Sequence, residues 1–188
     1  MGQDTKESGQ QKEIGILFSD FESFGLTYKF GTSKSMFRIK TILLSGSINE
    51  SNSFNSEIIN ENLRFKLGFG KEFRSDISKK AELRYGADVL FEYSKYESKT
   101  KNETSGNNYF LDKQIYYGPG INLIIGFNYS ISKKIFFGAE ILPYITYLTG
   151  TKTEKTYPDF VSTESDLSRL KYGLSNTSIM VSLTYRLK

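Results

Sequence analysis

The feature that most constrains the fold is a stretch of alternating side chains between residues 114 and 129, QIYYGPGINLIIGFNY. Every odd position from Ile115 to Tyr129 is apolar or aromatic, whereas the even positions are mostly polar or glycine. Successive side chains of a β-strand point to opposite faces, so this strand would have one continuous apolar face. At about 3.3 Å per residue it would span roughly 50 Å, much more than an ordinary soluble strand. A tilted strand of that length crosses a bilayer and extends beyond it, so the pattern predicts a transmembrane β-strand.

Seven further stretches alternate in the same way. The predicted strands cover residues 13–18, 24–30, 37–43, 62–73, 80–96, 114–129, 135–147 and 179–187. Short turns alternate with longer polar connections, and the strand number is even, which is the plan of an outer-membrane barrel. The predicted fold class is all-β: an eight-stranded antiparallel up-and-down transmembrane β-barrel over residues 13–188. Residues 1–12 are polar and without periodicity, so we expect a disordered N-terminal tail there.

The composition agrees with a barrel that faces lipid on one side only. Mean hydropathy is −0.41 and only 38% of residues are hydrophobic, yet 15% are aromatic and Gly is frequent at 16 residues. No run of 18 apolar residues exists, so a membrane-spanning helix is excluded. The net charge of +4 comes with no basic face and no recognition helix, so nucleic-acid binding is not expected.

The chain contains neither Cys nor His. Disulfides and thiolate metal sites are therefore excluded, and the commonest general base and metal ligand is missing. We expect no enzyme activity, no cofactor and no metal site. The first residues, MGQDTKESGQQKE, lack the apolar core of a signal peptide, so we expect that an export signal has been removed from the chain.

Charged residues gather on the face that the pattern places inside the barrel. The predicted lumen charge network consists of Glu13, Lys29, Arg38, Lys40, Arg64, Lys66, Glu72, Glu82, Arg84, Asp88, Glu92, Glu140 and Arg186. An eight-stranded barrel is just wide enough to be filled by side chains, and buried charges without partners are very costly. The near balance of charge favours an ion-paired plug, and the alternative is a gated path for protons or ions.

Aromatic residues on the outward face are expected at two levels, which suits the two membrane interfaces. The level near the short turns contains Phe30, Phe37, Phe73, Phe127, Tyr129 and Tyr185. Lys71 interrupts the outward apolar pattern, but close to a turn its ammonium group can reach the interface.

Long polar connections are predicted at about residues 49–61, 97–110 and 150–168, and recognition residues are often placed on such loops. The predicted contacts with a partner are the apolar residues of these connections: Tyr109, Phe110, Tyr157, Phe160 and Val161. Packing within the loops is the alternative explanation for the same residues.

The pattern over residues 13–188 resembles the small eight-stranded outer-membrane barrels, and is similar to the OmpX/Ail group and the OmpA transmembrane domain. The Gly-, Asn-, Lys- and aromatic-rich style also resembles the barrels of Bacteroidetes-type bacteria. Members of the barrel group often end in an aromatic residue, whereas this chain ends in Tyr185-Arg186-Leu187-Lys188. The resemblance implies a location in a bacterial outer membrane.

The function predicted from the sequence is a non-catalytic outer-membrane barrel whose loops mediate protein–protein interaction, either in adhesion or as an accessory subunit of a complex. The expected partners are outer-membrane lipid and a protein bound by the loops. Two alternatives stay open: a small channel, and a soluble barrel that carries a lipid inside. The soluble barrel would need its apolar residues to point inward.

Overall fold

The computed structural model describes residues 9–19, 24–53, 56–102, 108–157, 161–174 and 178–187, without the side chains of 42–45. Its ten strands are β1 (Gln11–Phe18), β2 (Phe24–Gly31), β3 (Ser35–Ser53), β4 (Ser56–Asp76), β5 (Ala81–Asn102), β6 (Asn108–Ser130), β7 (Ile135–Ile141), β8 (Tyr144–Tyr157), β9 (Val161–Gly173) and β10 (Ile179–Leu187). Over the same residues, no helix has the length and apolar character needed to cross a membrane.

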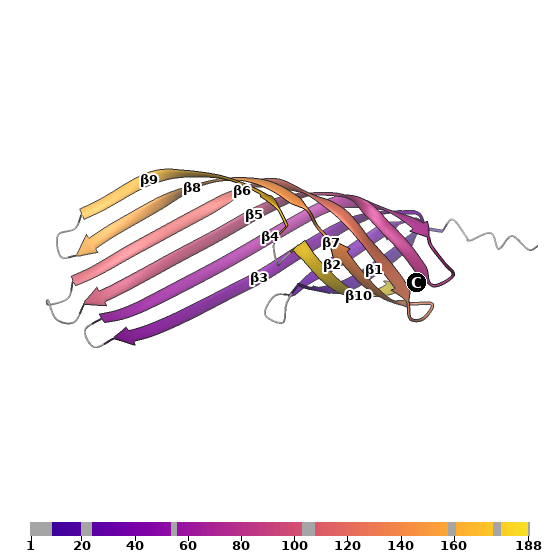
Figure 1. Cartoon of the computed structure of the whole chain (residues 1–188), viewed down its shortest axis with the longest axis horizontal. Coiled ribbons are helices and arrows are strands. Elements are labelled where there is room, and N and C mark those ends of the chain that lie inside the picture. Colours follow the sequence, from indigo (N-terminus) through magenta and orange to yellow (C-terminus); the bar gives the residue numbers. More distant parts are fainter. Residues whose placement is uncertain are drawn as a thin grey trace, which may run out of the picture.

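Eight of these strands close into a ring in the order β1-β2-β3-β4-β5-β6-β7-β10, and every neighbouring pair is antiparallel. The ring is closed by β1 and β10, with Ile14 opposite Tyr185. Figure 1 shows the ring at the end of the molecule where the C-terminus lies. The predicted eight-stranded antiparallel barrel is confirmed.

The predicted strand 135–147 is interrupted at Leu142 and Pro143, between β7 and β8. Pro143 has no backbone N–H to donate to a sheet. The N–H of Leu142 donates to the carbonyl of Ser178 at 2.7 Å, and the N–H of Leu123 donates to the carbonyl of Pro143 at 2.8 Å. Before the break the chain pairs with β6 and β10, and after it with β6 and β9. The break therefore carries β8 beyond the ring.

Long loops were predicted at residues 49–61, 97–110 and 150–168. The described parts of these ranges are strands instead, so for them the prediction was wrong. The strands β3 and β4 stay paired as far as Ser53 and Ser56, and β5 and β6 stay paired as far as Asn102 and Asn108. Their Asn-, Ser- and Thr-rich sequence hides the alternation, because both faces of these strands are polar. Backbone pairing continues nonetheless.

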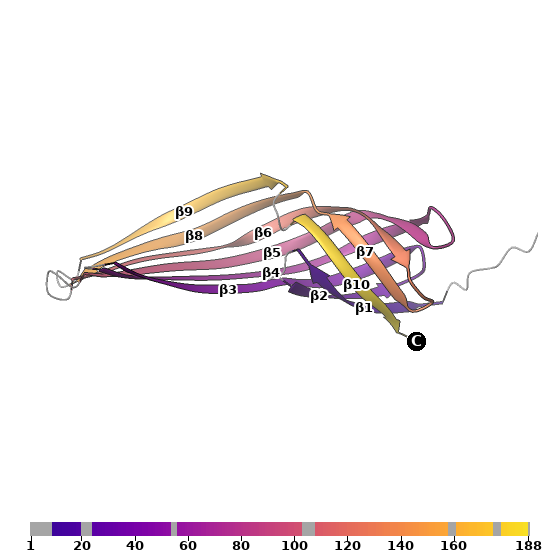
Figure 2. The ribbon, with the colours of Figure 1, turned by 60° about the horizontal axis from the view of Figure 1, so that its bottom comes forward.

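These strands form a six-stranded sheet that projects from one end of the ring, in the order β3-β4-β5-β6-β8-β9. We call this part the extension, and define it as residues 45–53, 56–64, 94–102, 108–117, 148–157 and 161–173. Figure 2 shows it nearly edge-on as a single layer, against which no other described strand packs. Its two edges are β3 and β9, because β1, β2 and β10 end at the ring.

The barrel has its apolar residues outside and its charged residues inside. Val89 is 63% exposed and Ile125 is 53% exposed, whereas Arg38 and Arg84 are each 1% exposed. This arrangement is the reverse of that in a water-soluble barrel, and it fits a barrel that is surrounded by lipid. The apolar outward face predicted from the alternation is therefore confirmed. The alternative of a soluble, lipid-carrying barrel would need its apolar residues inside, and the structure contradicts it.

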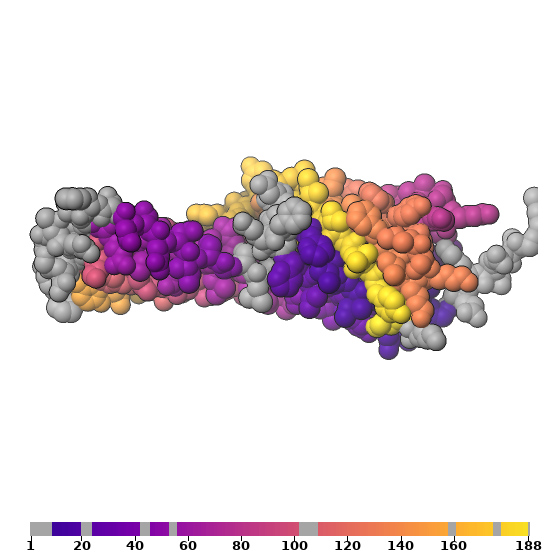
Figure 3. All heavy atoms as spheres, turned by 90° about the horizontal axis from the view of Figure 1, so that it is seen from below, coloured from indigo at the N-terminus to yellow at the C-terminus, as the bar shows by residue number. Residues whose placement is uncertain are grey.

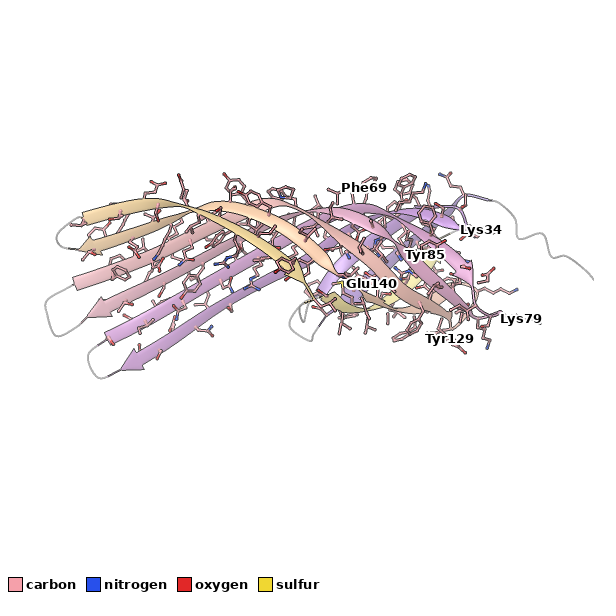
Figure 4. All side chains as sticks on the ribbon, turned by 45° about the horizontal axis from the view of Figure 1, so that its top comes forward. Lys34, Phe69, Lys79, Tyr85, Tyr129 and Glu140 are labelled. Atoms are coloured by element: carbon pink, nitrogen blue, oxygen red, sulfur yellow. The ribbon has the colours of Figure 1, made fainter. Side chains whose placement is uncertain are left out.

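An aromatic row covers the outer surface of β2, β3 and β4. The rings of Tyr28, Phe30, Phe37 and Phe69 stack in sequence, with centroids 5.6 to 6.0 Å apart. Figure 4 shows Phe69 and Tyr129 on the outside of the barrel and Glu140 within it. Rows of aromatic side chains on the outer surface of a barrel are typical of a membrane interface.

The first strand starts at Gln11, two residues before its predicted start. Of the predicted disordered tail, residues 1–8 lie outside the described residues.

Candidate functional site

The interior of the ring holds the main candidate site, because alternation turns one face of each strand inward. Nine of its buried charged side chains form one connected network of ion pairs, and we call these nine the lumen cluster. Its members are Glu13, Lys29, Arg38, Lys40, Glu72, Arg74, Arg84, Asp88 and Glu140. The cluster contains four carboxylates and five cations, contributed by β1, β2, β3, β4, β5 and β7.

Glu72 of β4 is the most highly connected carboxylate. It lies 2.7 Å from Arg84 of β5 and 2.6 Å from Arg74 of its own strand. Lys29 of β2 approaches it at 3.1 Å, and Arg38 of β3 at 3.5 Å. Four cations thus share one buried carboxylate, which ties four neighbouring strands together.

A second centre joins Arg38 to the far wall. The Arg38 guanidinium binds Asp88 with two nitrogens, at 2.7 and 2.5 Å, and also lies 2.8 Å from Glu140 of β7. Lys40 lies 3.4 Å from both Asp88 and Glu140. Arg84 also reaches Glu140, at 2.8 Å. Paired nitrogens against one carboxylate are a strong and geometrically specific form of ion pair.

Glu13 holds the end of the cluster that is nearer the short turns. Arg74 binds it at 2.7 Å and Arg186 of β10 binds it at 3.0 Å. The Arg186 guanidinium also lies 4.3 Å from the ring centre of Phe136. A hollow of about 670 Å³ opens at this end, and Phe136 and Arg186 are among the residues that line it.

An apolar layer lies beside the lumen cluster on the side of the extension. It consists of Leu17, Ile124, Leu142 and Met180, each no more than 2% exposed. Within the described residues, the ring is thus filled first by ion-paired side chains and then by apolar ones. Such filling is expected of an eight-stranded barrel, which is wide enough for side chains and little more.

A smaller ion-paired group lies where the ring opens into the extension. Glu92 lies 3.2 Å from Lys66 and 3.1 Å from Lys171 of β9. The Lys66 ammonium is also 5.8 Å from the ring centre of Tyr144. These contacts connect β4, β5 and β9 across the base of the extension.

The structure brings together most of the residues that the sequence placed in the lumen. Nine of them meet in or against the lumen cluster: Glu13, Lys29, Arg38, Lys40, Glu72, Arg84, Asp88, Glu140 and Arg186. Lys66 and Glu92 meet in the smaller group, and Glu82 lies 3.9 Å from Arg74 at the edge of the cluster. Arg64 is exposed, because it faces Ser45 and Ser94 beyond the ring, and its placement in the lumen is corrected.

Sequence reasoning missed Arg74 and Lys171. Arg74 continues the inward series of Glu72, but it was assigned to the turn that follows the fourth strand. A reading of the alternation carried two residues further would have found it. Lys171 gave no such signal, because no strand was predicted between residues 147 and 179, and most of β9 was assigned to the loop at 150–168.

The predicted contact residues lie in strands or at their ends. Tyr109 and Phe110 belong to β6, Tyr157 ends β8 and Val161 begins β9. The rings of Tyr109 and Tyr157 are 5.4 Å apart, so these two residues pack against each other between neighbouring strands. Phe110 is 40% exposed and Val161 57% exposed. Phe160 lies outside the described residues.

The chemistry available in the lumen is limited by its pairing. Each carboxylate of the lumen cluster is held by at least two Lys or Arg side chains, which leaves no free base beside a nucleophile. Among the described residues, no group of three acidic side chains is arranged to hold a metal ion. The arrangement joins the walls of the barrel through ion pairs across its interior.

Comparison with known proteins supports the fold. No protein-family model matches the chain, and no curated protein matches its sequence. Seven solved chains match its structure. One is a major outer membrane protein from Thermus thermophilus, with a TM-score of 0.54 and 9% identity, over 95% of this chain and 100% of that chain. Another is CarO from Acinetobacter baumannii, with a TM-score of 0.36 and 11% identity, over 96% of each chain.

At such low identity the likeness to the Thermus protein concerns the fold alone. The chain is a transmembrane β-barrel of the outer-membrane type. The closed ring and its apolar outer band place it in a bacterial outer membrane, as the sequence predicted. The narrower resemblance to the OmpX/Ail group stays a prediction.

Proposed function

We propose that the protein is a non-catalytic outer-membrane barrel that uses the extension to bind another protein, as an adhesin or as an accessory subunit of a membrane complex. The observation that supports this proposal is the extension itself. It is a hydrogen-bonded single layer beyond the ring, with two edges along which no other described strand pairs. An open edge presents unpaired backbone groups, which can pair with a strand of another chain.

Of the two edges, β3 is the better suited to strand pairing. Soluble proteins protect edge strands with charges, especially lysine, or with proline. The β9 edge carries Glu164, Asp166, Arg169 and Lys171, whereas the β3 edge from Gly46 to Ser53 carries Glu50 as its one charged residue. Figure 3 shows β3 continuing well past the short strands β1 and β2 along the open side of the molecule.

Ion pairs within and between neighbouring strands add to the backbone pairing of the extension. Lys95 and Lys99 of β5 hold Glu97 at 2.7 and 2.9 Å, and Lys99 lies 3.8 Å from Glu61 of β4. Lys152 of β8 contacts Asp112 of β6 at 3.7 Å. Exposed pairs of this kind stabilise little individually, but they add to a continuous backbone ladder.

A channel is the second candidate, and the interior does not favour it. Two successive layers fill the ring, one ion-paired and one apolar. A conducting path would have to displace buried charges from their partners, which costs several kcal/mol for each pair that is broken.

Site-specific cross-linking in cells tests the proposal. A photoreactive amino acid at Asn49 on the β3 edge should give one discrete adduct with a second protein. The same probe at Ser165 on the β9 edge is the matched control in the extension, and Val89 is the control on the lipid-facing surface. Adduct formation at Asn49 that does not exceed the level at Val89 would contradict the role of this edge.

A further inference from the structure

The three described short turns, at the end of the barrel opposite the extension, carry a repeated lysine motif. Two of them have the same sequence, Ile-Ser-Lys-Lys, at residues 77–80 and 131–134, and the third is Thr-Ser-Lys at 32–34. We call Lys34, Lys71, Lys79, Lys80, Lys133 and Lys134 the lysine rim. All six are exposed. Figure 4 shows Lys34 and Lys79 pointing away from this end of the barrel.

The two identical turns share one geometry. The Ser78 hydroxyl accepts hydrogen bonds from the backbone N–H groups of Lys80 and Ala81, at 3.3 and 3.1 Å. The Ser132 hydroxyl accepts the equivalent bonds from Lys134 and Ile135, at 3.2 and 3.1 Å. The serine thus fixes the backbone of each turn, and the two lysines that follow it are exposed in both turns.

Lys71 extends the rim onto the lipid-facing surface. It lies on the outward face of β4 between Phe69 and Phe73, and opposite Phe37 of β3. Its ammonium group is 5.2 Å from the ring centre of Phe37 and 5.3 Å from that of Phe73. Lys134 lies in the same way over Tyr185, at 5.9 Å. The rings hold these two ammonium groups at the level of the aromatic row.

No carboxylate of the described residues forms an ion pair with Lys71 or with Lys134, although lysines elsewhere in the chain are paired. A cation on a lipid-facing surface is expensive inside hydrocarbon unless an anionic group lies beside it, and the described residues supply none to Lys71. Its natural partner there is an anionic group of the lipid. The aromatic row beside Lys71 provides a flat apolar surface for the attached acyl chain.

We propose that the lysine rim binds the phosphate groups of anionic phospholipids in the leaflet that meets the short turns, with Lys71, Phe37 and Phe73 as its best-defined site. Short turns of outer-membrane barrels face the periplasm, so this leaflet is the inner one. The site would set the depth and the orientation of the barrel by charge. It rests on the membrane location of the barrel and not on the extension, so its failure leaves the proposed edge pairing untouched.

The absence of tryptophan from the chain allows a direct test. A Phe73→Trp variant keeps an aromatic face beside Lys71 and supplies a fluorescent reporter. The full-length variant is placed in phosphatidylcholine vesicles that contain brominated phosphatidylglycerol or brominated phosphatidylcholine, and quenching gives the relative affinity of the site for the two lipids. A second reporter, Phe91→Trp, lies on the outward face of β5, far from the short turns, and serves as the control.

We expect the reporter at position 73 to favour phosphatidylglycerol about fivefold, which is the effect of one lysine near an anionic membrane surface. Adding Lys71→Gln should remove this preference, and adding Lys101→Gln in the extension should not. The reporter at position 91 should show no preference.

Equal quenching by both lipids at position 73 would overturn the proposal, and so would a preference that survives Lys71→Gln. Loss of the preference in millimolar inorganic phosphate would mean that the rim binds free phosphate and not lipid. Because the first comparison keeps all lysines, it decides the matter even if a lysine variant fails to insert.

Discussion

Arg38 of β3 and Glu140 of β7 meet at 2.8 Å, although 102 residues separate them in the chain and three strands separate them around the ring in either direction. They come from opposite walls of the barrel. Two side chains are thus enough to bridge its interior, which is the most direct measure of how narrow the lumen is. The predictions below follow from this closed interior and from the sheet that projects from it.

Replacing Glu72 with Gln should destabilise the barrel by about 3–5 kcal/mol, because Lys29, Arg74 and Arg84 would lose their shared carboxylate inside the ring. Urea unfolding of the protein in lipid vesicles measures the change. Glu50→Gln on the exposed β3 edge is the control, and should stay within about 0.5 kcal/mol. Equal effects of the two substitutions would show that the buried pairing contributes little.

The reconstituted barrel should give no conductance steps above the bilayer background. The lumen cluster and the layer of Leu17, Ile124, Leu142 and Met180 close the ring one after the other. Single-channel recording in planar bilayers is the measurement. Regular conductance steps at low voltage would mean that these layers move apart. They would favour the channel over the proposed protein-binding barrel.

Gly70→Ala should destabilise the barrel by about 1–3 kcal/mol, since an added Cβ would overlap with Asp88 Oδ1 and with the Ala87 carbonyl oxygen. Gly68→Ala is a matched control on the same strand and the same face. Its nearest contacts would be at 3.8 Å, so we expect a change of no more than about 1 kcal/mol. Comparable losses for both variants would show that the space beside Asp88 is not restricted.

Backbone amides of the extension should exchange slowly with solvent deuterium. Residues 97–101 and 109–110 belong to paired strands, where a loop was predicted from the sequence. Hydrogen exchange followed by mass spectrometry in detergent resolves the two possibilities. Exchange in these segments as fast as in an unstructured peptide would contradict the extended sheet.

The extension should lose protection at acidic pH. Hydrogen bonds from Lys95 and Lys99 lower the pKa of Glu97 below its usual value of 4.5. The folded-state pKa is the lower one, so this carboxylate stabilises the sheet above pH 4.5, and the effect is lost as the pH falls through its folded-state value. We expect opening of β5 to increase on acidification, after correction for intrinsic exchange, and to be less pH-dependent in Glu97→Gln. An unchanged pH profile in that variant would count against this role.

The ring and most of its interior could be predicted from the sequence, because lipid outside and charge inside impose opposite demands on successive residues. The series Leu67-Gly68-Phe69-Gly70 and Phe91-Glu92 shows this contrast clearly. It fixes which side chains face inward, and so it also fixes which carboxylates and cations can meet.

The extension could not be predicted in the same way. Water lies on both of its faces, so Asn49, Ser51 and Asn60 are as acceptable on one face as on the other, and no alternation remains to be read. Arg64 was misplaced for the same reason. Arg64 lies at an even-numbered position of β4, like the inward-facing residues of the same strand, but at this height β4 has already left the ring and entered the extension. The break at Pro143 was missed because the apolar pattern runs through it.

The closing pair of the barrel has a consequence for assembly. The register of β1 with β10 runs only from Lys12 to Phe18, whereas the hairpin of β5 and β6 is paired along more than twenty residues of each strand. The long hairpins join segments that are close in sequence, so they lose little chain entropy and form early. The one pairing that must bring the two ends of the polypeptide together is also one of the shortest. We therefore expect a late folding intermediate that is an open sheet, in which the hairpins are complete but β1 and β10 are not yet paired.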